Sequence, residues 1–355
     1  MRRLHAHTAR PILRAKGRDF PWQGDRGLGK KRGIRRVLDK LEMFIALANE
    51  RHFGAAADLC GVTQPTLSSA MKKLEDQLGV QLIYRGSRFQ GLTPEGQRVL
   101  DWARRIVSDT RTMREEMRAS RRGLSGNLRI GVIPTALPMV VGLVEPFTKR
   151  HPNVRVAVLS RASGEILQQI DTLELDAGIT YLDNEPLGRM TTVPIYHESY
   201  RLLVHRNSPL ARQSEVTWAE AAGIPLCLLT SDMQNRRIIA QHLATAGAQA
   251  DAMVESNSMI ALVSHVMTGR WASIVPVKLA QMFSADVENE PRTGKMSGAR
   301  GNPAVLGGQN LTSIPIRAAD ARHLVGLIVA HREPHTPVLG ALLDEARRIA
   351  EPDAG

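Results

Sequence analysis

Apolar side chains recur with helical spacing near the start of the chain. Leu41 is followed by Phe44 and Ile45, the third and fourth positions onward, so the three lie on one face of an α-helix. The same kind of pattern predicts a second helix over residues 54–59 and a third over 64–78. The three segments predict a small helical domain.

A tight corner separates the second helix from the third. Gly61 has the backbone freedom that a sharp turn needs, and the alanines of the second helix allow two helices to approach closely. Helix, glycine corner and helix is the helix-turn-helix plan. A strand-like pair follows over residues 80–93, and its tip at 85–88 has turn-forming residues.

A long helix is predicted from Pro94, with Thr93 as its N-cap. It carries one narrow apolar stripe, and its other faces are crowded with arginine and glutamate. Such a stripe favours pairing with a second helix, as in a coiled-coil dimer; the alternative is packing against its own domain. The stripe consists of Val99 or Leu100, Ala103, Ile106 or Val107, Thr110, Met113 and Met117.

Beyond a linker at 120–127 the pattern changes to short apolar runs of strand length. Helical segments lie between most of them, which predicts an α/β domain. Residues 289–310 are rich in Gly and Pro without periodicity, and we expect an exposed, mobile insertion there. The strand-like runs are LRIGVI, VRVAVLS, DAGITY, SYRLLVH, PLCLLT, WASIVPV, LTSIPI and HLVGLIVA.

The formal net charge of +12 is unevenly distributed along the 355 residues. Residues 1–36 carry 12 basic and 2 acidic side chains, whereas residues 126–355 carry 21 basic and 22 acidic ones. The first 36 residues lack apolar periodicity, so we interpret them as a disordered basic extension or a segment that precedes the true start of the protein. The global charge therefore says little about the folded part.

The sequence carries no signature of an enzyme or a metal site. The two cysteines, Cys60 and Cys227, lie far apart, and none of the motifs G-x-S-x-G, G-x-G-x-x-G or H-E-x-x-H is present. We therefore expect no catalytic residues, no cofactor and no metal. No apolar run approaches the length of a membrane span and no secretory signal is present, so we expect a cytoplasmic protein without membrane contact.

The third helix places short hydrogen-bonding side chains outward, near its start. Glutamine can pair with adenine edges, serine and threonine with bases or phosphates, and lysine with phosphates, so this face suits entry into a major groove of DNA. The alternative is an ordinary solvated surface. The buried stripe is predicted as Leu67, Ala70 or Met71, Leu74 and Leu78, and the outward set as Gln64, Pro65, Thr66, Ser68, Ser69, Lys72 and Lys73.

Residues 38–120 closely resemble the N-terminal part of LysR-type transcriptional regulators. The resemblance is carried by the motifs A-A-x-L, V-T-Q-P-T-L-S, L-E-x-x-L-G-V-x-L, R-G-S-R and L-T-P-E-G. It implies an α/β protein: a winged helix-turn-helix with a long linker helix, then a two-lobed effector domain like a periplasmic binding protein. It also implies a homodimer or homotetramer that binds double-stranded DNA, with RNA polymerase as a further candidate partner.

The resemblance also implies domain boundaries. They are 1–36 for the extension, 37–93 for the winged helix-turn-helix, 94–120 for the dimerisation helix and 127–350 for the effector domain. Within the last, lobe one is expected at 127–197 and 312–350, and lobe two at 198–280.

By position, the family's DNA contacts fall on Gln64, Pro65, Ser68 and Ser69, and Arg88 in the wing would reach a minor groove. Many relatives have arginine where this chain has Ser69, so a guanine or phosphate contact is absent there.

An effector is expected in the cleft between the lobes, where helix N-termini would offer free N–H groups to an anion. Three helix starts carry hydroxyls or amides, at Pro134-Thr135, Thr230-Ser231 and Asn257-Ser258. Each could instead serve only as an N-cap. Tyr181 would line the same cleft or simply end a strand.

Short stretches such as PTALP and ESNSMI are similar to regulators encoded beside formate dehydrogenase genes. This similarity makes formate the first candidate effector, with larger carboxylates as the alternative. The alternative function is a cytoplasmic small-molecule-binding module without gene control.

Overall fold

A computed structural model describes residues 34–350, apart from 85, 87, 88, 185, 250, 285–309 and 318–321. The chain divides into two compact units, Met1–Val107 and Ser108–Gly355. Residues 1–33 of the predicted basic extension and 289–309 of the predicted insertion lie outside the described residues. Residues 34–36, predicted as part of the disordered extension, instead begin helix α1 (Ile34–Glu50).

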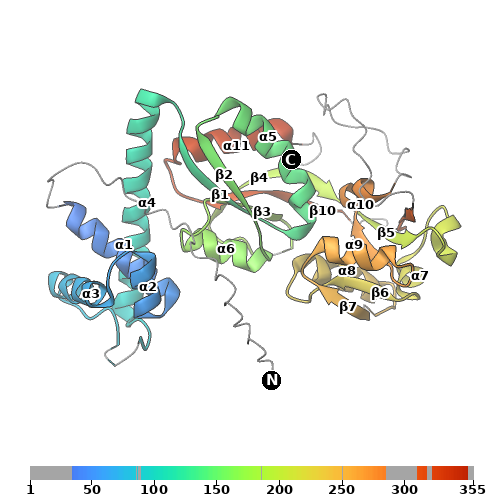
Figure 1. Cartoon of the computed structure of the whole chain (residues 1–355), viewed down its shortest axis with the longest axis horizontal. Coiled ribbons are helices and arrows are strands. Elements are labelled where there is room, and N and C mark those ends of the chain that lie inside the picture. Colours follow the sequence, from blue (N-terminus) through green and yellow to red (C-terminus); the bar gives the residue numbers. More distant parts are fainter. Residues whose placement is uncertain are drawn as a thin grey trace, which may run out of the picture. The chain divides into compact units, whose positions relative to one another are not determined.

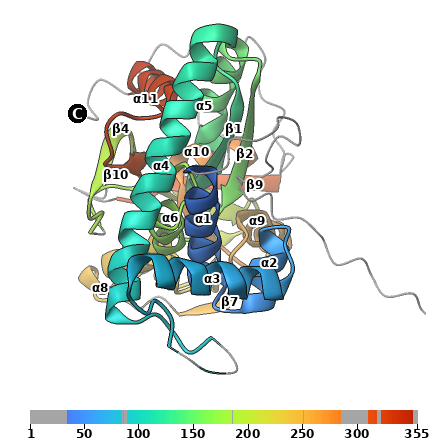
Figure 2. The ribbon, with the colours of Figure 1, turned by 90° about the vertical axis from the view of Figure 1, so that its left-hand side faces the viewer.

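The first unit is a bundle of helices around one apolar core (Figure 2). Phe44, Leu67 and Leu74 are fully or almost fully buried in this core, and each comes from an apolar stripe of its helix. The helices are α1 (Ile34–Glu50), α2 (Phe53–Leu59), α3 (Gln64–Leu78) and the first part of α4 (Pro94–Arg122). Their bounds agree with the helices predicted from the sequence to within a few residues.

The predicted hairpin after α3 is reduced to one isolated antiparallel bridge between Ile83 and Leu92. Both sides of it are fixed by hydrogen bonds to side chains. Glu75 accepts from the N–H groups of Leu82 and Ile83 at 2.8 and 3.2 Å, and Thr93 donates to the carbonyl of Gln81 at 2.6 Å. Backbone bonds from Tyr84 to Gly91 at 3.1 Å and from Thr93 to Leu82 at 3.0 Å join the two sides, and the Glu75 side chain holds the segment against α3.

The second unit contains a five-stranded sheet of order β2-β1-β3-β10-β4. Helices α5 and α11 cover one face of this sheet and α6 covers the other (Figure 1). The strands are β1 (Gly126–Val132), β2 (Val154–Ser160), β3 (Ala177–Tyr181), β4 (Met190–Glu198) and β10 (His323–Ala330), and the helices are η1 (Pro134–Ala136), α5 (Leu137–Arg150), α6 (Ser163–Asp171) and α11 (Pro337–Ile349).

A second group of strands in the same unit forms a three-stranded sheet of order β8-β5-β9 and a parallel pair of β6 and β7. Only Ser199 separates β4 of the first sheet from β5 of the second, so the chain crosses between lobes there. The elements are β5 (Tyr200–His205), η2 (Pro209–Arg212), α7 (Trp218–Ala222), β6 (Leu226–Leu229), α8 (Gln234–Thr245), β7 (Ala252–Ser256), α9 (Met259–Met267), β8 (Ser273–Pro276), α10 (Val277–Phe283) and β9 (Leu311–Pro315).

The lobes differ from the sequence-based division in one respect. Lobe one was expected to resume at residue 312, but Leu311–Pro315 pairs with β5 in the second sheet, and only from His323 does the chain rejoin the first. Apolar alternation predicts a strand but not its partner, because both sheets accept the same pattern.

Candidate functional site: an exposed polar helix and an inter-lobe pocket

The corner between α2 and α3 is built as the sequence predicts. Gly61 has a φ of 65°, in the left-handed region that glycine adopts without steric cost. The N–H of Gly61 donates to the carbonyl of Asp58 at 3.1 Å and that of Val62 to Ala57 at 3.0 Å. These bonds close the end of α2 and direct the chain into α3.

Helix α3 has one buried face and one exposed polar face. Leu67, Met71 and Leu74 are buried, whereas Leu78, predicted in the same stripe, is 46% exposed because the helix ends there beyond the core. Every residue predicted to point outward is exposed, namely Gln64, Pro65, Thr66, Ser68, Ser69, Lys72 and Lys73. The arrangement leaves a continuous surface of amides, hydroxyls and ammonium groups.

Two threonines form the cap at the N-terminal end of this surface. The hydroxyl of Thr63 accepts from the N–H of Thr66 at 3.4 Å as the N-cap, and the two hydroxyl oxygens lie 2.9 Å apart. The Thr66 hydroxyl thus takes part in the cap, which leaves Gln64, Ser68 and Ser69 as the freer polar groups. Arg88, predicted to reach a minor groove, lies outside the described residues.

The long helix α4 leaves much of its apolar stripe uncovered. Leu100 and Ala103 are buried in the core of the first unit, but Ile106, Met113 and Met117 are 45, 57 and 61% exposed. These spacings of seven and four residues keep the exposed side chains on one seam, as in a coiled coil.

A small pocket lies between the two lobes of the second unit. It is narrow, with room for about one water-sized group. The first lobe contributes the end of β1 with η1, the start of α6 and Tyr181, and the second lobe contributes the end of β6 and the start of α8. The lining residues are Ile133, Pro134, Thr135, Ser163, Tyr181, Leu229, Met233, Gln234 and Asn235.

A chain of buried hydrogen bonds backs the polar wall of this pocket. The hydroxyls of Tyr181 and Tyr200 both donate to Oε1 of Glu198, the latter at 3.1 Å. Asn235 donates to the oxygens of Tyr181 and Tyr200 at 3.2 and 3.4 Å, and the oxygens of Thr135 and Tyr181 lie 3.4 Å apart. Groups from both lobes therefore converge on one carboxyl at the crossing between them.

Burial sets the proton affinity of this cluster. It raises the pKa of Glu198 to about 7, against the opposing effect of the hydrogen bonds from Tyr181 and Tyr200. Burial and the neighbouring carboxylate hold the pKa of Tyr181 well above its usual value. Near neutral pH the carboxyl is close to half ionised, while the phenols keep their protons.

The structure brings together two of the six predicted effector residues, Thr135 and Tyr181. Thr230 and Ser231 lie just before α8 but do not line the pocket, and Asn257 and Ser258 are exposed. The hydroxyl of Ser258 accepts from the N–H of Ala261 at 3.4 Å, which is the capping role named as the alternative. No pattern in the sequence points to Glu198, Tyr200 or Asn235, since only the fold places them at or behind the wall.

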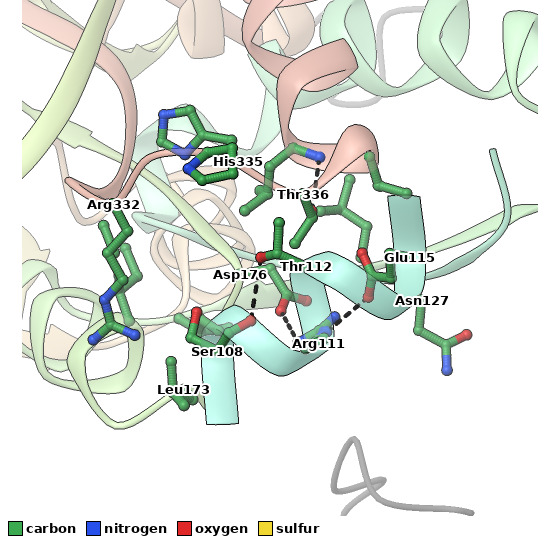
Figure 3. A pocket seen from close by; sticks show the side chains of 17 residues that line it. Ser108, Arg111, Thr112, Glu115, Asn127, Leu173, Asp176, Arg332, His335 and Thr336 are labelled. Atoms are coloured by element: carbon green, nitrogen blue, oxygen red, sulfur yellow. Dashed lines mark hydrogen bonds and ion pairs between the residues drawn. The ribbon is translucent and has the colours of Figure 1, made fainter. Parts of the chain in front are cut away.

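A larger pocket, of about 60 Å³, lies where α4 meets the first lobe within the second unit (Figure 3). Arg111 of α4 bonds to Asp176 at 2.9 Å and to Glu115 at 2.8 Å. Asp176 also accepts from the backbone N–H of Arg129 at 2.8 Å. Opposite charges in the wall compensate one another, so this pocket is not biased toward either sign.

Comparison with known proteins identifies the family. Residues 38–97 match the family described as bacterial regulatory helix-turn-helix protein of the lysR family, and residues 121–288 match the LysR substrate binding domain. The DNA-binding transcriptional dual regulator OxyR of Escherichia coli K12 is 32% identical over 237 residues, covering 66% of this chain and 77% of OxyR. The hydrogen peroxide-inducible genes activator of Pectobacterium carotovorum is 31% identical and covers 66% and 78%.

Solved structures share the fold. A full-length OxyR variant from Pseudomonas aeruginosa has a TM-score of 0.64 at 24% identity and covers 88% of this chain and 96% of its own. The regulator CbnR in complex with its target DNA has a TM-score of 0.55 at 22% identity, with 88% and 99% covered.

The helix-turn-helix and the two-lobed domain thus define a DNA-binding transcriptional regulator with an effector-binding domain. The chain belongs to the LysR family of regulators. The family's matched members are regulators of transcription, not enzymes. No helix within the described residues is long and apolar enough to span a membrane.

Proposed function

We propose that this regulator reads its operator with the exposed face of α3 and responds to a small molecule in the inter-lobe pocket. The polar face of α3 is the observation that supports the first part. Gln64, Ser68 and Ser69 would contact base edges, and Lys72 would contact a phosphate. Arg88 would add a minor-groove contact from the wing. Since its target is DNA, we place the protein in the cytoplasm.

We propose further that two copies pair along α4, as a homodimer or as half of a homotetramer. The support is the seam of Ile106, Met113 and Met117, which the described residues of one chain leave exposed. RNA polymerase is a candidate partner of the DNA-bound form.

The effector of this proposal is small and polar. The pocket is narrow, so an effector must be small. Formate is a candidate from the similarity of short stretches to regulators encoded beside formate dehydrogenase genes, although the pocket lining argues against a carboxylate. The pocket lining offers Thr135, Ser163 and Asn235 as polar groups but no lysine, arginine or histidine to balance a negative charge.

Peroxide sensing through an internal disulfide has no support in the second unit, although relatives are named for hydrogen peroxide. Cys227 is the sole cysteine of residues 108–355. It is fully buried, its Sγ donates to the carbonyl of Leu262 at 3.6 Å, and burial raises its pKa to about 11. A buried thiol of high pKa is a poor nucleophile toward oxidants.

Footprinting on the DNA upstream of this protein's own gene tests the proposal. The full chain should protect a defined site, and Gln64→Ala should lose that protection at concentrations where the wild type retains it. Lys149→Ala, at an exposed position of α5, is the matched control and should leave the footprint intact. A footprint that survives Gln64→Ala unchanged would contradict the assignment of α3.

A further inference from the structure

A buried acidic group lies just behind the lining of the inter-lobe pocket. Glu198 is 2% exposed and lies directly behind Tyr181, whose hydroxyl donates to it. The pocket also adjoins the starts of α6 and α8, whose N-terminal dipoles favour a negative charge. Because Glu198 supplies that charge from within the protein, a second anion in the pocket would meet a like charge across a single phenol.

The donors in the wall are also largely used. The protons of Tyr181 and Tyr200 go to Glu198, so their oxygens present lone pairs, and the Asn235 amide donates to both. The amide of Gln234 donates to the carbonyl of Asn184 at 3.3 Å, and its oxygen accepts from Arg237 at 2.8 Å.

Each of these groups has a fixed number of protons to give. A phenol has one, and here it is directed away from the pocket. A carboxylate ligand needs donors, but the Tyr181 hydroxyl and the Asn235 amide nitrogen already donate within the protein, so the Tyr181 oxygen is an acceptor at this wall. Arg237 is an exposed cation that bonds to Gln234 from outside the lining, so it does not supply a countercharge at the wall.

We propose that the inter-lobe pocket selects a small effector that donates hydrogen bonds and is neutral or positively charged, and that Glu198 determines this selectivity by opposing a carboxylate. This inference rests on the proposed effector pocket and specifies the chemical class of its ligand. Glu198 acts through Tyr181, so it is a positioning and charge-setting residue that does not line the pocket itself.

Three probes of nearly the same shape and different charge test this inference: acetate, acetamide and acetamidinium. Their binding to the full-length protein is measured by calorimetry at about pH 8, where the Glu198 carboxyl is mainly ionised. The wild type should bind acetamide and acetamidinium at least about tenfold more tightly than acetate. In Glu198→Gln the preference over acetate should fall to about threefold or less, because the buried charge is gone while the shape is kept.

Glu145→Gln is the matched control, since it removes an exposed carboxylate of α5 outside the pocket lining and should preserve the wild-type preference. If Glu198→Gln does not fold, Tyr181→Phe replaces it. That change removes the acceptor at the wall. It should weaken the binding of acetamide and acetamidinium by about tenfold without weakening the binding of acetate.

Equal or tighter binding of acetate by the wild type overturns the inference. So does an unchanged preference in the folded variant, or the absence of binding by all three probes. Footprinting without any added ligand separates this failure from failure of the proposed function. If the wild type gives a footprint but binds acetate as well as the other probes, only the inference about Glu198 is contradicted. If the wild type gives no footprint, the proposed function is contradicted.

Discussion

At the scale of single residues, two buried carboxyl groups of the second unit have opposite electrostatic surroundings. Asp176 is buried, which would raise its pKa, but Arg111 and Arg129 outweigh burial and hold the pKa below its usual value. The only groups that lower the pKa of Glu198 are hydrogen-bond donors, so the effect of burial is larger and the pKa is raised. The first group joins α4 to β3, and the second joins the two lobes.

Replacing Asp176 should destabilise the second unit strongly. Asp176→Asn leaves the buried Arg129 guanidinium, 13% exposed, without its counter-charge, which costs about 3–5 kcal/mol when one member of a buried pair is lost. Urea unfolding measures this loss. Asp344→Asn, which breaks an exposed pair with Arg347, is the control and should cost less than about 1 kcal/mol. Equal losses in the two variants would contradict a buried role for Asp176.

The pH dependence of stability should reflect Glu198 with a definite sign. Its pKa is raised from 4.5 to about 7 in the folded state, so the folded protein holds the proton more tightly. This contribution is present below about pH 4.5 and is lost as pH rises through about 7, for a total of about 3 kcal/mol. Thermal unfolding of wild type and Glu198→Gln from pH 5 to 8 measures it. A wild-type stability that rises over this range relative to the variant would contradict the raised pKa.

Asp176 has the opposite sign, because its folded pKa lies below the ordinary value of 3.8. Its contribution is present above that value and is lost as the pH falls through the folded pKa. The stability contributions of Glu198 and Asp176 therefore change over separate ranges of pH.

The sequence predicted Thr135 and Tyr181 for one pocket, and the structure brings them together there, because they lie at the carboxyl ends of β1 and β3, which are parallel neighbours in the sheet. It did not find Glu198 or Asn235. A glutamate at a strand end and an asparagine in a polar helix start resemble surface residues, and only the return of the chain from the other lobe buries them.

At the scale of elements, the order of helices in the first unit could be predicted almost completely, because α1 and α3 have clear apolar stripes and capping residues mark the starts of α3 and α4. In the second unit β4 and β7 were missed. Strand β4 contains threonines and Pro194 and forms the edge of its sheet, with a break in register between Val325 and Gly326 opposite it. Proline is tolerated at such an edge, but a proline within the segment argues against a strand when only the sequence is known.

The start of α4 depends on a close approach that only glycine allows. A Cβ on Gly96 would lie 2.0 Å from the carbonyl oxygen of Leu82, a backbone atom that cannot move away alone. Gly96→Ala should therefore lower the stability of the first unit by about 1–3 kcal/mol, as overpacking does. Thermal unfolding measures the change, with Gly164→Ala on α6 as a control, because a Cβ there would meet open space within 4 Å. No loss in Gly96→Ala would contradict the close contact.

The exposed seam of α4 predicts the mode of self-association. Met113→Asp with Met117→Asp should reduce the homodimer or homotetramer to smaller species, because two charges would be buried in an apolar interface. Light scattering coupled to size exclusion measures the mass. Leu78→Asp is the control at another exposed apolar position and should retain the wild-type mass. A doubly substituted protein that keeps its mass would place the interface elsewhere.

At the scale of the whole molecule, the two units have separate cores. The exposed polar face of α3, for which we propose DNA reading, belongs to the first unit, and the inter-lobe pocket belongs to the second. The family match spans both units.

The basic N-terminal segment should contribute affinity without choosing the site. Residues 1–36 carry a net charge of +10, which attracts any DNA through release of counterions. Deleting them should reduce non-specific binding and its salt dependence, while the operator footprint stays the same. Loss of the sequence-specific footprint in the truncated protein would contradict this division.

The most direct test of a DNA-reading α3 is the affinity of two variants for operator and unrelated DNA over a series of salt concentrations. Gln64→Ala should weaken operator binding by about 1–3 kcal/mol, leave binding to unrelated DNA unchanged and relax the base preference at one position. Lys72→Ala should weaken both DNAs alike and reduce the salt slope by about one. If Gln64→Ala binds operator as the wild type does, or if both variants weaken every DNA equally, α3 does not read the sequence.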